Sequence, residues 1–577
     1  MKDGFLKAAA LSPALRVADC AYNTAQILQE LRAASARGVK LAVFPEFCLT
    51  GYTCGDLFLQ RTLQQGALTG LQTLLDASRE LDVVALVGLP LLVRGKLYNC
   101  AAVLCRGRLL GLVPKTYLPN YGEFYEKRQF NPGSTEVETL TVCGQQVPFG
   151  TSLLFRCREM PSFVLGVELC EDLWSALPPS TFHALAGATV IANLSASDET
   201  VGKAEYRRAL VANQSARLLC GYLYASAGHG ESTQDMVFAG HDLIAENGTL
   251  LAETAPFAGG HAETELDCQR MESERARNTS FEPSTDGYQT VDFSLTLTDT
   301  ALTRFVDPTP FVPGDPQRRA ERCELILKMQ ADGLAKRLEH AHAKTAVIGI
   351  SGGKDSSTVA ALAAAAYGRD HVYGVLMPNG VQPDIDYSQA LVEHLQIPHC
   401  TINIHDAVQG VLTEMEQAGL TPSRQTVVNL PSRIRMSTLY AVAQSLDAGV
   451  VINTSNLSED WVGYCTIYGD SAGAFSPLGM YTTEEVIALG RQLGLPEKFL
   501  IKPPSDGLTG LTDEDNLGFT YHAVNEYVRR GTVDPVIKEQ IDDRHRVSRF
   551  KFQTIPVYHN GLPMALEEET HYYKKKT

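Results

Sequence analysis

The first half of the chain combines one helical hydrophobic pattern with several short apolar runs. The helical pattern starts near Ala21 and ends at Gly38, with apolar side chains three and four positions apart, so it predicts an amphipathic helix. Short apolar runs bounded by polar or Gly/Pro-rich stretches are typical of buried strands. They lie at residues 41–44, 83–87, 99–104, 163–167, 189–192 and 288–293. This order predicts an α/β sandwich, in which the polar stretch between residues 256 and 287 is a surface excursion.

The second half follows a proline-rich boundary and alternates strands with helices. Four prolines lie between Asp307 and Pro316, and such a stretch stiffens the backbone into an extended linker. Beyond it, apolar runs at 346–350, 372–376 and 450–453 alternate with helical patterns, which is typical of a doubly wound parallel sheet. The predicted divisions are an N-terminal domain over residues 1–300, a proline-rich linker over 301–320 and a second domain over 321–577.

Composition and charge exclude several classes of protein. The chain has 577 residues, of which 44% are hydrophobic and 20% charged, so it can bury large cores. Its formal net charge of −16 is the opposite of the basic surface that nucleic-acid binding needs. The longest apolar run, Val83 to Val93, has 11 residues where a membrane-spanning helix needs about 20, and the N-terminus lacks the apolar core of a signal peptide. We therefore expect a cytoplasmic protein that binds neither nucleic acid nor membrane.

A glycine-rich turn connects the first strand of the second half to the helix that follows. The segment Gly349–Ser357 reads GISGGKDSS, and its glycines allow a turn in which backbone N–H groups and the helix N-terminus face one anion, as at a phosphate site. It fits neither the Walker pattern nor GxGxxG. It resembles the SGGxDS loop of the PP-loop ATP pyrophosphatases, which grips the pyrophosphate of ATP during cleavage between the α- and β-phosphates. On this resemblance Asp355 helps to hold Mg²⁺, and the ATP-binding residues are Gly349, Ile350, Ser351, Gly352, Gly353, Lys354, Asp355 and Ser356.

Further segments downstream carry a more specific resemblance. They begin at Asn429 (NLPSRIRM), Thr454 (TSNLSE), Gly469 (GD), Lys502 (KPPSDGL) and Arg549 (RFKFQ). In this order they resemble the NAD synthetase family, which adenylates the nicotinate carboxylate of deamido-NAD with ATP and lets ammonia displace AMP. The resemblance implies that Thr454 contacts ATP and that Glu459 joins Asp355 in holding Mg²⁺. The residues that it places at deamido-NAD are Asn429, Arg433, Glu459, Asp470, Ser505 and Lys551.

The first half offers a source for that ammonia. Glu46, Lys115 and Cys170 each follow a predicted strand, in the segments FPEFC, VPKTYLPNY and GVELCEDLW, which resemble the active sites of the nitrilase superfamily. A thiol with an ordinary pKa of about 8.5 needs a base, which is Glu46. Lys115 stabilises the oxyanion that forms when Cys170 attacks the glutamine amide. The resemblance also makes Glu126 a supporting residue that orients Lys115, and the residues that it places at glutamine are Tyr121, Ser197 and Lys203.

Together the halves resemble the glutamine-dependent NAD synthetases over nearly the whole chain. The implied fold is an N-terminal α-β-β-α nitrilase-like sandwich followed by a Rossmann-like PP-loop domain. The implied substrates are deamido-NAD, ATP and glutamine, with ammonia passing between the sites through a buried tunnel. Relatives imply a homo-oligomer, an octamer in bacteria.

Other readings stay open beside this one. Another PP-loop amidotransferase, such as GMP or asparagine synthetase, would act on a different carboxylate, but position 2 is Lys2 and so offers no N-terminal cysteine nucleophile. A PP-loop tRNA-modifying enzyme is expected to be basic, and a nucleotide sensor would have a decayed catalytic site. Because all three implied substrates carry carboxylate or phosphate groups, we expect both sites to be cationic islands on an acidic protein.

Overall fold

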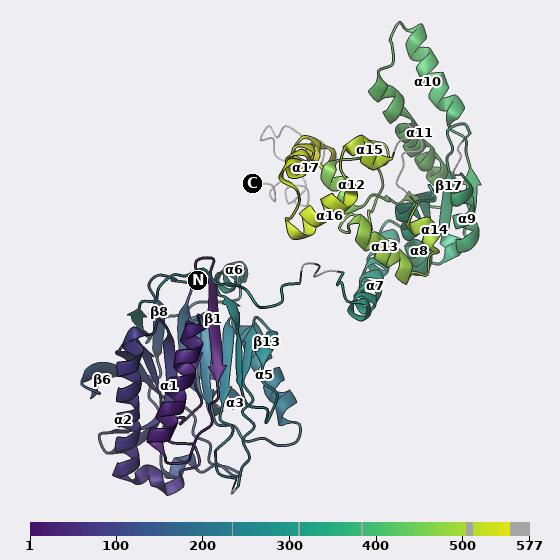
Figure 1. Ribbon diagram of the computed structural model, residues 1–577. Helices are drawn as coiled ribbons and strands as arrows, with labels where there is room; N and C mark the ends of the chain where they lie inside the picture. Colours follow the sequence, from purple (N-terminus) through teal and green to yellow (C-terminus); the bar gives the residue numbers. More distant parts are fainter. Residues whose placement is uncertain (234, 308, 310–311, 382–384, 503–511, 554–577) are drawn as a thin grey trace, which may run out of the picture. The chain divides into compact units, whose positions relative to one another are not determined.

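The computed structural model describes residues 1–233, 235–307, 309, 312–381, 385–502 and 512–553. The chain divides into two compact units, Met1–Phe305 and Val306–Thr577 (Figure 1). Each unit has its own sheets and its own hydrophobic core.

Two β-sheets form the centre of the first unit. The eight-stranded sheet is ordered β14 (His261–Asp267), β1 (Phe5–Leu11), β2 (Leu41–Val43), β3 (Val84–Val93), β4 (Lys96–Cys105), β5 (Arg108–Pro114), β7 (Gln145–Phe149) and β6 (Glu138–Val142). The seven-stranded sheet is ordered β13 (Thr249–Glu253), β12 (Leu243–Glu246), β11 (Gly221–Ser226), β10 (Val190–Ser195), β9 (Val164–Leu169), β8 (Leu153–Cys157) and β15 (Gln289–Phe293). The helices are α1 (Cys20–Ala36), α2 (Arg61–Ala77), α3 (Glu171–Trp174), α4 (Pro179–Leu185), α5 (Lys203–Leu218) and α6 (Cys268–Arg277).

Alternation along the strands arranges these elements in four layers. On β1, Ala8 and Ala10 point into the core between the sheets, whereas Ala9 and Leu11 pack with the buried faces of α1 and α2. On β11, Leu223 faces the same inter-sheet core, while its neighbouring tyrosines pack with α4 and α5. The predicted α-β-β-α sandwich is therefore confirmed.

One expectation for this unit is wrong. The polar stretch assigned to a surface excursion contains β14, which pairs antiparallel with β1 over its whole length, and helix α6. Polar residues conceal a strand periodicity of two in β14, where Ala262 and Leu266 are buried in the core between the sheets. An edge strand with so few apolar positions gives only a weak sequence signal.

The second unit is built on a four-stranded parallel sheet. Its order is β18 (His399–Thr401), β17 (Val372–Leu376), β16 (Thr345–Gly349) and β19 (Gly449–Val451). The helices are α7 (Pro316–His340), α8 (Lys354–Tyr367), α9 (Ile385–Leu395), α10 (His405–Gln417), α11 (Arg424–Ser445), α12 (Leu457–Val462), α13 (Thr483–Gln492), α14 (Glu497–Leu500), α15 (Asp513–Leu517), α16 (Tyr521–Arg530) and α17 (Pro535–Ser548). On β16, Ala346 and Ile348 pack with α7, α8 and α9, whereas Val347 packs with α10 and α11 on the other face. The sheet is therefore doubly wound, as predicted.

The junction between the units is shorter than the predicted linker. Arg304 pairs with the buried carboxylate of Glu246, at 2.8 and 3.0 Å, and Thr303 bonds to Glu265, so the chain stays fastened to the first unit up to this point. Helix α7 already begins at Pro316, where the Asp315 side chain caps it. Among the described residues, every helix is too short or too polar to cross a lipid bilayer.

Candidate active sites

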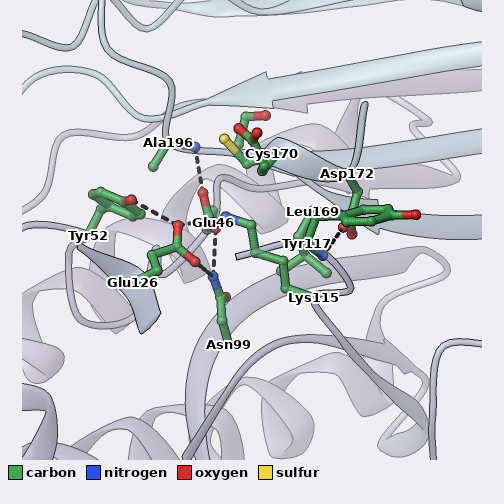
Figure 2. Close-up of polar contacts among 12 residues, drawn as sticks. Glu46, Tyr52, Asn99, Lys115, Tyr117, Glu126, Leu169, Cys170, Asp172 and Ala196 are labelled. Carbon is green, nitrogen blue, oxygen red and sulfur yellow. Dashed lines mark hydrogen bonds and ion pairs between the residues drawn. The ribbon is translucent and has the colours of Figure 1, made fainter. Parts of the chain in front are cut away.

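Three polar side chains of the first unit meet at the ends of three strands (Figure 2). Glu46 follows β2, Lys115 follows β5 and Cys170 follows β9. The first two strands belong to the eight-stranded sheet and the third to the seven-stranded sheet, so the site is assembled across the interface of the sandwich. All three side chains are buried.

Lys115 is held by two carboxylates. Its Nζ lies 2.7 Å from Oε1 of Glu46 and 2.6 Å from Oε1 of Glu126. Burial lowers the pKa of Lys115, but Glu126 and Glu46 outweigh it and keep this pKa well above its ordinary value, so the side chain is an ammonium. Burial also raises the pKa of Glu126 to about 7, against the opposing charge of Lys115. The structure therefore places Glu126 where the sequence expects a residue that orients Lys115.

Further groups that the sequence did not single out hold these carboxylates. Asn99, on β4, donates from Nδ2 to Oε1 of Glu46 at 2.6 Å, and the Tyr52 hydroxyl donates to Glu126 at 2.8 Å. The backbone N–H of Ala196, just after β10, donates to Oε2 of Glu46 at 2.9 Å. Asn99 could have been suspected from the sequence, because it is a polar residue within the mostly apolar segment of β4. A buried side-chain amide needs hydrogen-bond partners.

Cys170 lies at a strained turn between β9 and α3. Its φ is +41° and its ψ −99°, a conformation that a residue with a side chain rarely adopts. Its backbone N–H donates to the carbonyl of Leu194 and to Oδ1 of Asn193, both at 3.0 Å. Burial raises the pKa of the Cys170 thiol well above its ordinary value; Glu46 and Glu126 add to this, while Lys115 opposes it. The resting cysteine is therefore a neutral thiol that needs a base when it attacks.

Tyr121, one of the residues predicted to contact glutamine, lies beside the Cys170 turn. Its hydroxyl donates to both carboxylate oxygens of Glu171, at 2.9 and 3.0 Å, and its ring is 6.1 Å from that of Phe124. The sequence analysis missed Glu171, although it directly follows Cys170. Burial raises the pKa of Glu171, and the Tyr121 hydroxyl opposes the shift.

Lys203, the predicted cation of the same group, lies within reach of these residues. Its Nζ is 5.9 Å from the ring centroid of Phe124 and 5.4 Å from that of Trp174, and it pairs with Asp198. Ser197 precedes Asp198 and is buried. The structure thus brings together a cation, an acidic side chain, hydroxyl groups and aromatic walls next to Cys170.

A second site lies in the second unit, in a cavity of about 760 Å³. The cavity opens at the carboxyl ends of β16 and β19, where the strand order of the parallel sheet reverses and ligands of such folds bind. The glycine-rich turn forms part of its wall and leads directly into α8. Gly352 has φ +72°, and a Cβ built on it would lie 2.7 Å from the backbone nitrogen of Ser388. Only glycine fits here, because α9 packs directly against the turn.

Most of the residues predicted for the nucleotide site line this cavity. They are Gly349, Ile350, Ser351, Gly353, Lys354, Asp355, Ser356, Asn429, Thr454, Glu459, Asp470 and Lys551. Gly352 shapes the turn without lining the cavity, and Ser505 lies outside the described residues.

Arg433 does not line the cavity. Helix α11 presents one face to it, carrying Val428, Ser432, Arg435 and Leu439 at helical spacing, and Arg433 lies off that face, exposed, with its Nε 3.4 Å from the carbonyl of Ile467. Two positions along a helix turn a side chain by about 200°, so Arg435 lies on the wall whereas Arg433 points to the opposite side of the helix.

Lys354 is enclosed by carboxylates in this cavity. Its Nζ lies 2.9 Å from Asp355 and 3.8 Å from Glu459, and Asn456 donates to Oδ1 of Asp355 at 2.9 Å. Burial raises the pKa of Glu459 well above its ordinary value, and the adjacent charge of Asp355 adds to this. The two acidic side chains thus lie close together beside a single lysine, and their mutual repulsion disfavours ionisation of Glu459.

Each site lies within the segment that matches a known family. Residues 7–276 match the carbon-nitrogen hydrolase family, and residues 326–558 match the NAD synthase family. The glutamine-dependent NAD(+) synthetase of Mycobacterium tuberculosis (strain ATCC 25618 / H37Rv) is 38% identical over 487 residues, which cover 81% of this chain and 71% of that protein. The protein of that name from Thermotoga maritima is 30% identical over 537 residues, or 90% of this chain and 87% of its own.

The chain belongs to the glutamine-dependent NAD(+) synthetase family. Its first unit is the carbon-nitrogen hydrolase part and carries Glu46, Lys115 and Cys170. Its second unit is the NAD synthase part and carries the glycine-rich turn and the cavity. Family membership excludes the tRNA-modifying enzyme and the other amidotransferases as readings of this sequence.

Proposed function

We propose that this protein converts deamido-NAD, ATP and glutamine into NAD, AMP, pyrophosphate and glutamate, with the nitrogen released in the first unit and consumed in the second. The observation that carries the proposal is the Glu46–Lys115–Cys170 cluster, in a chain of this family whose second unit has a glycine-rich turn on a large cavity. Neither site alone accounts for amide formation from glutamine.

The buried cluster suits amide hydrolysis through a thioester. Glu46 removes the thiol proton as Sγ of Cys170 attacks the amide carbon, and the ammonium of Lys115 stabilises the oxyanion. When the tetrahedral intermediate collapses, the C–N bond breaks and the nitrogen takes the proton from Glu46, leaving as ammonia. Water then attacks the thioester with Glu46 as base, which gives glutamate and restores the thiol. Glu126 keeps Lys115 in place throughout.

Glutamine is zwitterionic at its α-carbon, and the neighbouring side chains match both charges. Lys203 is suited to the α-carboxylate, with Ser197 beside it. Glu171 is suited to the α-ammonium, and Tyr121 orients it through the bonds described above. The aromatic rings near Lys203 complete the walls around the substrate stem.

The second unit is suited to adenylation of a carboxylate. ATP lies on the glycine-rich turn, where backbone N–H groups and the N-terminus of α8 face the phosphates, and Thr454 contributes a further contact. A nicotinate oxygen attacks the α-phosphorus and pyrophosphate leaves; ammonia then attacks the acyl adenylate and AMP leaves. Deamido-NAD is bound along the cavity wall by Asn429, Asp470 and Lys551, which the family resemblance selects. The resemblance also names Arg433, which lies off this wall, and Ser505.

Asp355 and Glu459 fit a Mg²⁺ ion. Both offer carboxylate oxygens, the ligands that Mg²⁺ prefers, and a dication shared with the ATP phosphates would offset their mutual repulsion. Among the described residues no group of three or more metal-binding side chains is present, so phosphates and water would complete the coordination. Bound there, Mg²⁺ would neutralise the leaving pyrophosphate. Chelation with EDTA should then stop AMP release and spare glutamine hydrolysis; continued AMP release would contradict the metal site.

The ammonia tunnel, the homo-oligomer and the cytoplasmic location that the resemblance implies stay predictions. The molecular mass in solution tests the oligomer, and a monomer would contradict it.

The division of labour is tested by Cys170→Ala, assayed with two nitrogen sources. We expect glutamine-dependent NAD formation to be lost and ammonium-dependent formation to be retained, because the second unit needs only free ammonia. Cys220→Ala is the matched control, since Cys220 is also buried in the first unit but lies among apolar side chains away from the site. Equal loss with both nitrogen sources in Cys170→Ala would contradict the proposal.

A further inference from the structure

Asp172 lies between two of the catalytic strand ends without being part of the predicted site. It is the second residue of α3, and its side chain is buried. Its Oδ1 accepts the backbone N–H of Tyr117 at 2.7 Å and that of Thr116 at 3.1 Å. Its Oδ2 accepts the backbone N–H of Leu169 at 3.0 Å. One carboxylate therefore joins the residues that directly follow Lys115 to the residue that directly precedes Cys170 (Figure 2).

The ends of β5 and β9, which carry Lys115 and Cys170, belong to different sheets and are not paired with each other. The Lys115 backbone is bonded within its own half of the sandwich, where its N–H donates to Asn99 and its carbonyl accepts from Gly133, both at 2.8 Å. The Cys170 N–H is bonded to β10, in the other sheet. Between β5 and β9 the contact is apolar, with Val113 packed in the same core as Val167. Apolar packing is non-directional, so it fixes the separation of the sheets better than their register.

Polar bridges supply the direction that apolar packing lacks. Glu46 makes one of them, because its backbone N–H donates to Ser195 and its side chain accepts from Ala196 at the end of β10. Asp172 makes another, on the side of Lys115 and Cys170. The backbone at Cys170 is strained, and a strained conformation persists only where neighbouring bonds hold it, so a bond to Leu169 is needed beside it.

We propose that Asp172 is a positioning residue of the glutaminase site, which sets the Lys115 ammonium at the place where the oxyanion forms on the carbonyl attacked by Cys170. It acts through the backbone on either side and does not touch the substrate. The inference rests on the proposed hydrolysis of glutamine. It adds that Asp172 holds Lys115, on one sheet, in a fixed position relative to Cys170, on the other.

The test separates positioning from folding by comparing two reactions of the same thiol. Glutamine hydrolysis needs Lys115 opposite the developing oxyanion. Alkylation of Cys170 by iodoacetamide forms an S–C bond, expels iodide and passes the thiol proton to Glu46, but it forms no oxyanion and so does not need Lys115. The alkylation rate is read from the mass of the peptide that contains Cys170.

For Asp172→Asn we expect the kcat of glutamine hydrolysis to fall about 100-fold, the size of effect that a misplacement of about 1 Å produces, with KM and the alkylation rate nearly unchanged. Asp242→Asn is the matched control: Asp242 is also fully buried and accepts from a backbone N–H, that of Ser226, and from the Ser12 hydroxyl, but it bonds to neither catalytic strand end. This control should keep the ratio of hydrolysis to alkylation. A fall of both rates by the same factor in Asp172→Asn, or unchanged hydrolysis, would overturn the proposal.

A second variant keeps the test decisive if Asp172→Asn does not fold. Asp172→Glu retains both acceptor oxygens and lengthens the side chain by one methylene, so it should shift Lys115 away from Cys170 and lower the same ratio. A wild-type ratio in folded Asp172→Glu would also overturn the role of Asp172. If the wild-type protein itself released no ammonia from glutamine, the proposed function would fall instead, and the two failures are therefore distinguishable.

Discussion

At the residue scale, the glutaminase site holds more negative than positive charge. Lys115 is one ammonium between the carboxylates of Glu46 and Glu126, and the site is closed to solvent. Burial raises the pKa of Glu126 to about 7, so this side chain changes its charge within the physiological range. Its ionised form is the one that holds Lys115 most strongly, because it adds the attraction between opposite charges, which is strong in a buried site.

We therefore expect glutamine hydrolysis to fall as the pH is lowered through about 7. Below this pKa, Glu126 is protonated and Lys115 keeps only Glu46 as an ionic partner; above it, both carboxylates hold the ammonium. The measurement is kcat/KM for glutamine between pH 5 and 9. Glu126→Gln should be about tenfold slower at high pH, as expected for loss of a charge-assisted bond, and should lack this acidic limb. The same limb in Glu126→Gln would assign it to another group.

Residue-level prediction from sequence selected three side chains that the structure brings together, and missed most of the groups around them. Glu46, Lys115 and Cys170 stand in recognisable segments at strand ends. Asn99 contacts Glu46 and Tyr52 contacts Glu126 only because β4 and the loop after β2 are folded against the same site. Contacts between segments so far apart along the chain depend on the register of the sheets, which hydrophobic patterns alone do not fix.

At the element scale, the glycine-rich turn shows how a loop is fixed by the helix next to it. The turn runs from β16 into α8, and α9 approaches Gly352 closely enough that no Cβ fits between them. The positive φ of Gly352 adds a second reason for glycine, because other residues pay a steric cost there. The backbone N–H groups of the turn can face one anion only while this approach is kept.

Gly352→Ala should therefore abolish the synthetase reaction with either nitrogen source and leave glutamine hydrolysis unchanged. We expect at least a tenfold loss in ammonium-dependent NAD formation, since a displaced turn weakens both ATP binding and its alignment. Gly368→Ala, at the other end of α8, is the matched control: it also has a positive φ, +91°, but its Cβ would approach no closer than 3.8 Å to any neighbour. Equal loss in both variants would show that backbone strain, rather than the contact with α9, is responsible.

Helices and strands with a regular pattern of apolar residues were predicted well. Those in which polar and apolar residues share one face were not. The buried strands β16 and β17 and the Ala-rich helix α8 appear where apolar patterns place them. β14 was missed because charged side chains occupy the face that points away from the core between the sheets, and one of them, the buried Glu265, is compensated by Thr303 and the backbone of Arg304. Arg433, which the resemblance placed at deamido-NAD, lies off the cavity face of α11 for a related reason, since a motif names a segment but not the face of the helix that meets the cavity.

At the scale of the whole molecule, the net charge of −16 raised the question of how anionic substrates are attracted. The glutaminase site is not the expected cationic island, whereas the described lining of the nucleotide cavity has six cationic side chains against four acidic ones. Lys115 and Lys354 are each flanked by two carboxylates, and Lys203 is paired with Asp198. These cations are held in place before any substrate arrives, which favours orientation over long-range attraction. In the nucleotide site, other lining cations such as Arg435, Arg544 and Lys551 add to the attraction from backbone N–H groups and the proposed Mg²⁺.

The same principle of buried pairing fixes where the first unit ends. The carboxylate of Glu246 is 1% exposed, and Arg304 is its ionic partner from the far end of the unit. Arg270 also pairs with Glu246, but at 3.4 Å and with a side chain that is 49% exposed, so without Arg304 the buried charge is poorly compensated. Breaking a buried pair costs about 3 kcal/mol or more, whereas exposed pairs contribute about 0–1 kcal/mol. Arg304→Ala should therefore lower the unfolding temperature of the first unit, measured by calorimetry.

Arg208→Ala is the matched control, because Arg208 pairs with Glu253, whose side chain is 36% exposed. This variant should change the unfolding temperature little. Equal shifts in the two variants would mean that residues 303–305 are fastened to the first unit by contacts other than this pair.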